Sequence, residues 1–394
     1  MVQRALLVLA LIFASPSAKC EPDSSFAAFL TALWPDAAKA GITRATFDSA
    51  FSGLTPDAGV IAARRRQPEY GKPFGAYLAS LVSQSRVAAG ARKSAQWAVT
   101  LRAVEERYGV DPSILVSIWG IESSYGSGEQ RWDVFRSLAT LAEARFHHPF
   151  FRDELLSALK ILQDDHIPRR EFVGSWAGAM GQAQFLPSSF LRYAVDFDGD
   201  GKADIWRNVP DVLASIANYL HETGWQKGLP WGFEVRVPAG FDYRLSRGTF
   251  SEWAQRGFAR ADGRPLPTDD AAAILFFPSG ASGPAFLVTN NFIVLKRFND
   301  SDAYALAAGV LSDLLRGLPP VRASWPADDF QPSRDERIAL QRRLASLGYK
   351  IAEFQGHFDF DLRDAVRDQQ RRFGMIPDGY PSRAFLDHIG VRTP

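Results

Sequence analysis

One helix, with residues that favour both its start and its end, is expected in the stretch Asp111-Pro-Ser-Ile-Leu-Val-Ser-Ile-Trp-Gly-Ile-Glu-Ser-Ser-Tyr-Gly126. Asp111 is a good N-cap, because its carboxylate can accept a hydrogen bond from an unpaired backbone N–H of the first turn. Pro112 suits the first helical position, where no backbone donor is needed. Gly126 favours the end of a helix. We therefore expect a short helix that begins at Pro112 and stops at about Gly126.

The apolar face of this helix ends in a carboxylate. Ile114, Leu115 and Ile118 form the face, and Glu122 follows Ile118 by four residues, about one helical turn. A carboxyl group on an apolar face loses solvation, so its charged form is disfavoured and it can hold a proton near neutral pH. Such a group can act as a general acid. An ion pair with an arginine, or simple exposure at the helix end, is the alternative that the helix alone leaves open.

The composition is that of an ordinary soluble globular protein. Of 394 residues, 46% are apolar and 23% are charged, and the formal net charge is +1. The length allows two domains with a sizeable core. Because the net charge is so small, no overall field favours nucleic acid or an anionic membrane as a partner.

The N-terminus has the pattern of a secretory signal in residues 1–20. Arg4 precedes an apolar run from Ala5 to Ala14, and small residues follow it. The run is too short to span a bilayer. Cys20 raises the alternative of a lipoprotein anchor, but Lys19 stands where such a motif needs a small residue. We expect a soluble, exported, periplasmic protein without an internal disulfide, since Cys20 is the single cysteine.

The remaining chain divides into three parts, namely residues 24–317, 318–332 and 333–394. The first part is helical in pattern, with a change between Trp231 and Phe298 to short apolar runs separated by turn residues, which predicts a small β-containing insertion. The proline-rich second part is typical of a stiff linker. The last part predicts a small three-helix module. We expect a mainly α protein.

A calcium site is predicted in the loop that starts at Asp196. Its candidate ligands are Asp196, Asp198, Asp200, Lys202 through its carbonyl, Asp204 and Asp211. Gly201 stands at the sixth position, where such loops turn sharply. Arg207 replaces the glutamate expected at the twelfth position, so Asp211 would have to close the shell from a longer loop. A plain Asp/Gly turn is the alternative; if an ion binds, its role is to stabilise the loop.

Several longer motifs resemble one enzyme family. They are Gly120-Ile-Glu-Ser-Ser-Tyr-Gly126, Gly174-Ser-Trp-Ala-Gly-Ala-Met-Gly181, Gln184-Phe-Leu-Pro-Ser-Ser189, the Asp196 loop, Ala217-Asn-Tyr-Leu220, Asn291-Phe292 and Arg297-Phe-Asn299. In this order they resemble the lytic murein transglycosylase B family, glycoside hydrolase family 103, from about Phe26 to Leu315. The tail, with Leu347-Gly-Tyr349 and Asp378-Gly379, resembles the peptidoglycan-binding domain 1 family.

The resemblance implies a lysozyme-like α-helical catalytic domain that cleaves the MurNAc-GlcNAc β-1,4 bond of peptidoglycan without water and leaves 1,6-anhydroMurNAc ends. Glu122 would be the sole catalytic carboxylate, acting first as acid and then as base, whereas ordinary glycosidases use two carboxylates. No cofactor is implied for the chemistry. The implied partners are peptidoglycan glycan strands, with other cell-wall enzymes as candidates, and we expect a monomer.

By the same resemblance, several residues would contact the substrate: Tyr77, Ser123, Ser175, Gln184, Tyr219, Asn291 and Phe298. One of them departs from the family pattern, because Phe298 stands where the family has a tyrosine. Stacking would survive, but a hydrogen bond to substrate or to Glu122 would be lost, so we expect altered efficiency. A hydrolase of the same glycan and a wall-binding scaffold with an inactive lytic domain are the competing hypotheses.

Overall fold

The computed structural model describes residues 24–65, 71–145 and 149–391. The predicted signal segment and Cys20 lie outside these residues. The α-helices are α1 (Ser24–Lys39), α2 (Arg44–Phe51), α3 (Ala58–Arg65), α4 (Phe74–Leu81), α5 (Gln84–Gln96), α6 (Ala98–Tyr108), α7 (Pro112–Ser123), α8 (Val134–Glu143), α9 (Phe150–Gln163), α10 (Pro187–Tyr193), α11 (Val209–Glu222), α12 (Phe250–Gln255), α13 (Asn290–Phe298), α14 (Asp302–Leu315), α15 (Arg334–Ser346), α16 (Phe360–Arg372) and α17 (Arg383–Ile389). The strands are β1 (Trp132–Asp133), β2 (Val173–Gly174), β3 (Gly232–Arg236), β4 (Arg247–Thr249), β5 (Ala259–Arg260), β6 (Ala272–Phe276) and β7 (Ala285–Val288). Within the described ranges, no helix has the length and apolar character needed to cross a membrane.

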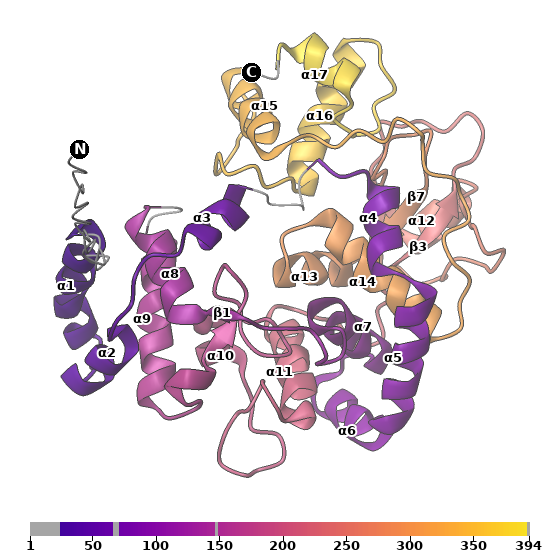
Figure 1. The fold of residues 1–394 in the computed structure, drawn as a ribbon. Coiled ribbons are helices and arrows are strands. Elements are labelled where there is room, and N and C mark those ends of the chain that lie inside the picture. The colour runs from indigo at the N-terminus through magenta and orange to yellow at the C-terminus, as the bar shows by residue number, and fades with distance from the viewer. Residues whose placement is uncertain (1–23, 66–70, 146–148, 392–394) are drawn as a thin grey trace, which may run out of the picture.

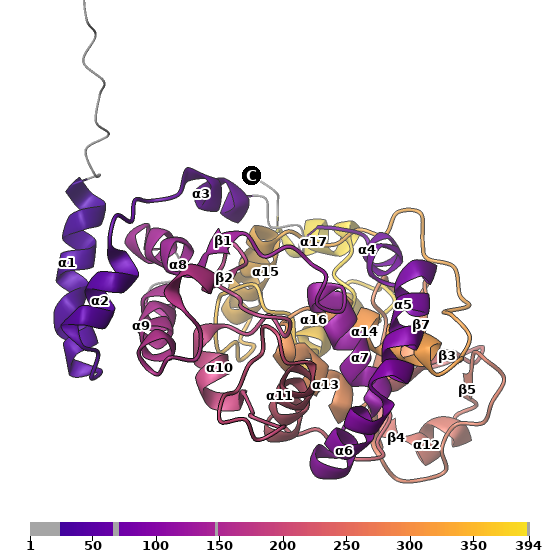
Figure 2. The same cartoon turned by 60° about the horizontal axis from the view of Figure 1, so that its bottom comes forward.

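The predicted mainly α architecture is confirmed. Apart from α12, the helices from α1 to α14 share one large hydrophobic core, in which α7 is buried along almost its whole length. Figure 1 shows α7 near the middle of the molecule, among α5, α6, α11 and α14. The pair α1 and α2 lies at the edge of the molecule in both views (Figure 1, Figure 2).

The β-containing insertion is also confirmed, and it forms a five-stranded antiparallel sheet in the order β4-β6-β7-β3-β5. The register pairs Val235 with Ala285 and Ile274 with Val288. The sheet has a core of its own beneath α12, a helix that starts with a capping box between Thr249 and Glu252. One part of the expectation was wrong, because the end of this region, α13, is helical.

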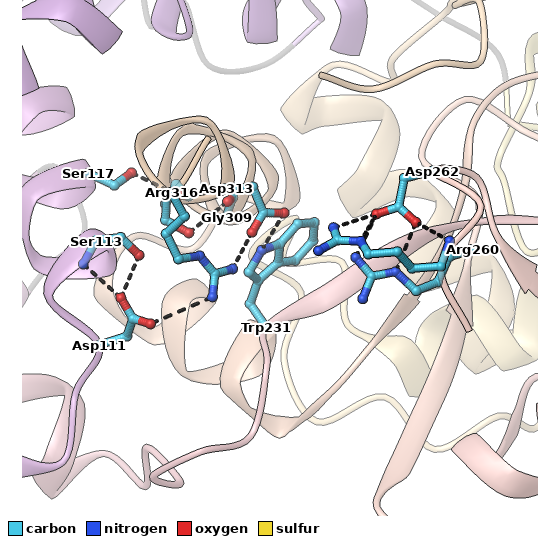
Figure 3. A network of polar contacts seen from close by, with 12 residues as sticks. Asp111, Ser113, Ser117, Trp231, Arg260, Asp262, Gly309, Asp313 and Arg316 are labelled. Atoms are coloured by element: carbon cyan, nitrogen blue, oxygen red, sulfur yellow. Dashed lines mark hydrogen bonds and ion pairs between the residues drawn. The ribbon is translucent and has the colours of Figure 1, made fainter. Parts of the chain in front are cut away.

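The helices α7 and α14 pack antiparallel, and polar contacts mark their register (Figure 3). At one end Arg316, just after α14, lies 3.6 Å from Asp111, which caps α7. In the middle the hydroxyl of Ser117 donates to the carbonyl of Ala308 at 2.7 Å. As residue numbers rise along α7 they fall along α14, so the far end of this helix pair brings Glu122 to the start of α14.

The C-terminal module (residues 333–391) is a three-helix unit, as predicted, with its own core around Leu340, Leu362 and Phe385. Figure 1 shows it above α13, in colours that run from light orange in α15 to yellow in α17. Its Phe360 ring leaves that core and packs against Phe276 of β6, with ring centroids 5.7 Å apart. The module is therefore docked on the rest of the molecule through apolar as well as polar contacts.

The segment between α14 and α15 lies along the surface of the main helical region. The Trp325 ring stacks on Phe74 of α4, with centroids 6.2 Å apart and planes 6° apart. The backbone N–H groups of Arg322 and Ala323 each donate to the Glu234 carboxylate at 2.8 Å. These contacts hold residues 322–325, in the middle of the proline-rich stretch, against β3 and α4.

Candidate active site

The C-terminal end of α7 presents Glu122 at the boundary between core and solvent. The helix begins as predicted, because the Asp111 carboxylate accepts a hydrogen bond from the Ser113 backbone at 2.7 Å. It ends at Ser123, earlier than expected, because Ser124 and Tyr125 adopt positive φ angles of 50° and 61°. Glu122 therefore lies in the last turn and is half-buried.

The turn after α7 is locked by Tyr125. Its ring folds back over Gly120, where an added Cβ would lie 2.5 Å from the ring, so only glycine fits there. Its hydroxyl donates to the carbonyl of Arg86 on α5 at 2.8 Å. Because the ring and its hydroxyl are both held, the backbone next to Glu122 is fixed.

A tyrosine that sequence reasoning missed contacts Glu122 directly. The hydroxyl of Tyr304, in the first turn of α14, donates to Glu122 Oε1 at 2.5 Å. Tyr304 is only 1% exposed. A buried tyrosine hydroxyl usually has a hydrogen-bond partner. A tyrosine among the alanines at the start of α14 was therefore the one sign in the sequence that a polar contact forms there. The partner itself could not be read from the sequence, because 182 positions separate the two residues.

Aromatic rings surround this pair. The ring of Phe298 lies parallel to that of Tyr304, with centroids 6.4 Å apart and planes 2° apart. Tyr219 of α11 contacts Phe298 edge-on at 4.9 Å and lies 5.8 Å from Phe185. Burial raises the pKa of Tyr219 to about 12, so its hydroxyl stays protonated and donates to the carbonyl of Arg297. The predicted residues Tyr219 and Phe298 are thus brought together, and Phe298 connects them to Tyr304, the residue that is bonded to Glu122.

The glycine-rich segment after β2 forms a compact loop that presents Ser175 and Gln184. The hydroxyl oxygen of Ser175 accepts hydrogen bonds from the backbone of Ala177 and Ala179, at 3.3 and 3.0 Å. Gln184 has a positive φ of 52°, and its side chain donates to the carbonyl of Gly181 at 2.8 Å. Both side chains are half-buried, so they retain access to solvent.

Two other predicted residues are buried and have structural contacts. The Ser123 hydroxyl donates to the carbonyl of Trp119 at 3.2 Å and accepts from the backbone of Gly126 at 3.1 Å. Asn291 is 0% exposed, and its amide bonds to backbone groups of Gln226 and Leu229. Both residues therefore shape the surroundings of the site. Tyr77, also predicted, is half-buried on α4, which packs against α14.

The acidic loop brings together three of its six predicted ligand residues. Carboxylate oxygens of Asp196, Asp198 and Asp211 lie within 4.8 Å of one another. Asp211 is 0% exposed, and burial raises its pKa, as do the nearby charges of Asp198 and Asp196. Three converging carboxylates, one of them buried, form an all-oxygen donor set that fits a hard cation such as Ca²⁺.

Asp200 and Asp204, which were also predicted as ligands, are not part of this group of carboxylates. Asp200 accepts from the Lys202 backbone at 2.9 Å, and Asp204 accepts from the backbone of Trp206 at 2.8 Å. The Lys202 ammonium reaches the carbonyl of Asp165 at 3.0 Å. Asp211 also accepts from the backbone of Asp204 at 2.8 Å, so the carboxylate that completes the cluster fixes the loop as well. Its distance along the chain from the Asp196 motif explains why a twelve-residue template does not include it.

Comparison with known proteins agrees with this geometry. Residues 25–313 match the family model described as Transglycosylase SLT domain, and residues 333–389 match the putative peptidoglycan binding domain. A curated relative, membrane-bound lytic murein transglycosylase B of Escherichia coli (strain K12), is 35% identical over 209 residues, which are 51% of this chain and 55% of the relative. The chain thus spans about half the length of the curated relative it matches.

Two solved structures are also similar. SltB3 from Pseudomonas aeruginosa, in complex with NAG-anhNAM-pentapeptide, is 46% identical with a TM-score of 0.84, covering 93% of this chain and 100% of that chain. An Escherichia coli lytic transglycosylase in complex with calcium is 28% identical with a TM-score of 0.61, covering 74% of this chain and 93% of that chain. The Transglycosylase SLT domain model matches residues 25–313, which are more than half of this chain, so the chain belongs to that family.

Proposed function

We propose that the protein is a lytic transglycosylase that cleaves the MurNAc-GlcNAc β-1,4 bond of peptidoglycan and leaves 1,6-anhydroMurNAc ends. The observation that carries this proposal is the position of Glu122, half-buried at the end of α7 and bonded to Tyr304 beside the aromatic rings of Tyr219 and Phe298. The names of the relatives, and the peptide-bearing disaccharide in the SltB3 complex, support the same substrate class.

Glu122 would perform two proton transfers. In its protonated form it gives its proton to the glycosidic oxygen as the bond to the MurNAc anomeric carbon breaks. The resulting carboxylate then accepts the proton of the 6-hydroxyl of the same sugar, whose oxygen bonds to the anomeric carbon and closes the anhydro ring. No water is consumed, and Glu122 regains its proton.

Tyr304 would assist the first transfer. Its hydroxyl is bonded to Oε1, so it holds the carboxyl group in one orientation and stabilises the negative charge that forms when the proton leaves. This contact supplies Glu122 with a tyrosine hydroxyl although Phe298 has none. The substitution at Phe298 therefore leaves Glu122 with a donor.

The sugar rings would be bound by the half-buried residues around Glu122. The rings of Tyr219 and Phe298 suit the apolar faces of sugars, while Ser175 and Gln184 offer polar atoms to their edges. Tyr77 is proposed as a further aromatic contact. Ser123 and Asn291 are assigned to holding the site, since their polar atoms bond to backbone groups.

Mass spectrometry of the muropeptides released from purified sacculi tests the proposal. Wild type should release anhydro-muropeptides and Glu122→Gln should release none. Glu106→Gln, the same change at an exposed position of the neighbouring α6, is the matched control and should behave as wild type. Reducing-end products would make the protein a hydrolase. If neither wild type nor Glu122→Gln released muropeptides, the protein would be one that binds the cell wall without cleaving it.

We infer further that residues 1–20 export the chain to the periplasm and that the acidic loop binds Ca²⁺. The calcium complex of the Escherichia coli relative and the cluster of Asp196, Asp198 and Asp211 support the ion. Asp211 would carry the stabilising effect, because it joins the ion to the backbone of Phe197 and Asp204. A melting temperature that is the same in Ca²⁺ and in chelator would remove the ion from the proposal.

A further inference from the structure

The first residue of α14 is held by cations from two other elements. Asp302 Oδ1 lies 2.7 Å from the ammonium of Lys296 on α13, and its Oδ2 accepts from the guanidinium of Arg363 on α16 at 2.7 Å. The three side chains are at most 10% exposed. This charged triad (Lys296, Asp302 and Arg363) therefore lies inside the contact between the main helical region and the C-terminal module.

The charged form of the Asp302 carboxylate is favoured by its two cationic neighbours. Burial alone would raise the pKa of Asp302, but the charges and hydrogen bonds of Lys296 and Arg363 outweigh it and lower the pKa to about 2. Removing one partner of a buried ion pair leaves an uncompensated charge, which a folded protein relieves by moving the remaining groups. The position of Asp302 is thus tied to the position of its cations.

Arg363 is fixed from the side of the module. Its guanidinium lies over the ring of Phe358 at 4.7 Å and donates to the carbonyl of Gly379 at 3.3 Å. The Lys296 ammonium also donates to the carbonyl of Phe358 at 2.9 Å. The module therefore holds both cations that hold Asp302.

The same helical turn of α14 carries the tyrosine that contacts Glu122. Tyr304 follows Asp302 by two residues, and its backbone N–H donates to the N-cap Ser301 at 3.2 Å. The opposite end of α14 is held to the start of α7 through Arg316 and Asp111. With that end fixed, the triad determines where the first turn of α14, and with it the Tyr304 hydroxyl, lies against the last turn of α7.

We propose that Arg363 is a positioning residue for the lytic reaction. Through Asp302 it holds the first turn of α14 so that the Tyr304 hydroxyl meets Glu122. The C-terminal module is then part of the scaffold of the active site, in addition to any contact it makes with glycan. This inference rests on the proposed role of Glu122 as the acid and base.

A double-mutant cycle of Arg363→Ala and Tyr304→Phe tests the inference, with kcat and KM measured on one short soluble glycan. Alone, Arg363→Ala should lower kcat by about tenfold with little change in KM. A misplacement of about 1 Å can cost up to about 100-fold in rate, so a loss of this size is reasonable for a shifted hydroxyl. In the Tyr304→Phe background it should lower kcat less than about twofold, since the contact it positions is already absent.

Arg247→Ala is the matched control, because Arg247 of β4 also joins the C-terminal module to the rest of the molecule, through Asp361 and Asp364, without an ion pair to Asp302. It should leave kcat near wild type. Arg363→Lys, which keeps the charge, should restore part of kcat, and it replaces Arg363→Ala in the cycle if that variant does not fold.

An equal loss of kcat in both backgrounds would overturn the inference, as would a rise in KM with kcat unchanged, which would make Arg363 a glycan contact. The proposed function fails by a different result, namely Glu122→Gln retaining wild-type products. The two failures are therefore distinguishable.

Discussion

Tyr304→Phe removes one oxygen atom from the candidate active site and changes little else. The ring is retained, so its parallel contact with Phe298 survives, and the lost atom is the donor to Glu122 Oε1. Tyr304 is 1% exposed, so little space is open beside it for a water molecule to replace the hydroxyl. We expect a variant that folds as wild type but transfers the first proton more slowly.

The size of the effect follows from the charge on the acceptor. A hydrogen bond to a charged group contributes about 1.5–3 kcal/mol. The Tyr304 bond strengthens as Glu122 loses its proton, so most of its contribution belongs to the transition state and should appear in kcat. Because about 1.4 kcal/mol corresponds to a tenfold change in rate, we expect kcat to fall about 10- to 100-fold with KM nearly unchanged.

The assay is the initial rate of anhydro-product release over a range of substrate concentrations. Tyr349→Phe is a matched control, because it also removes a tyrosine hydroxyl that donates to a carboxylate, Asp368, but within the C-terminal module. It should keep wild-type kcat. A Tyr304→Phe variant within twofold of wild type, or a loss that Tyr349→Phe reproduces, would refute the assigned role of Tyr304.

Three further predictions concern stability. Gly120→Ala should lower the melting temperature despite a gain of about 1 kcal/mol in helix propensity, because its methyl group would lie 2.5 Å from the Tyr125 ring; an unchanged or higher value would contradict that packing. The pKa of Asp302 falls from 3.8 to about 2 on folding, so its contribution of about 2 kcal/mol is present above pH 3.8 and is lost as the pH falls through about 2. Urea unfolding should show wild type losing that advantage over Asp302→Asn across this range, and a constant difference would argue against the shift. Chelation should lower the melting temperature of wild type and have no effect on Asp211→Asn, whereas equal shifts would place the ion elsewhere.

Much of the helix that carries Glu122 could be predicted, because the determinants are local. The cap at Asp111 and the spacing from Ile114 to Glu122 lie within a few turns of chain. The helix end was misplaced because Ser124 and Tyr125 adopt left-handed backbone angles, which side chains with a Cβ rarely do. Tyr125 is held there by its contacts with Gly120 and Arg86, and such contacts are invisible to a local rule.

The parts that could not be predicted depend on pairing between distant segments. Glu122 meets Tyr304 only because α7 and α14 pack antiparallel in one register. Asp211 was predicted as a ligand, but its complete burial was not, because that burial depends on how the first turn of α11 packs against the loop. The docking of the module depends on Arg363 reaching Asp302, and no pattern in either segment indicates that pair.

The segment that joins α14 to α15 also determines how freely the C-terminal module can move relative to the catalytic region. A flexible tether of that length would let the module search a volume around the catalytic region and capture neighbouring strands. Here Trp325 is stacked on Phe74 and the backbone of Arg322 and Ala323 is bonded to Glu234, so that search is restricted. If the module binds glycan as proposed, its effective concentration would be high only for a strand that passes Glu122 in one orientation. Binding through both units would then favour strands that run in the matching direction over strands that are merely nearby.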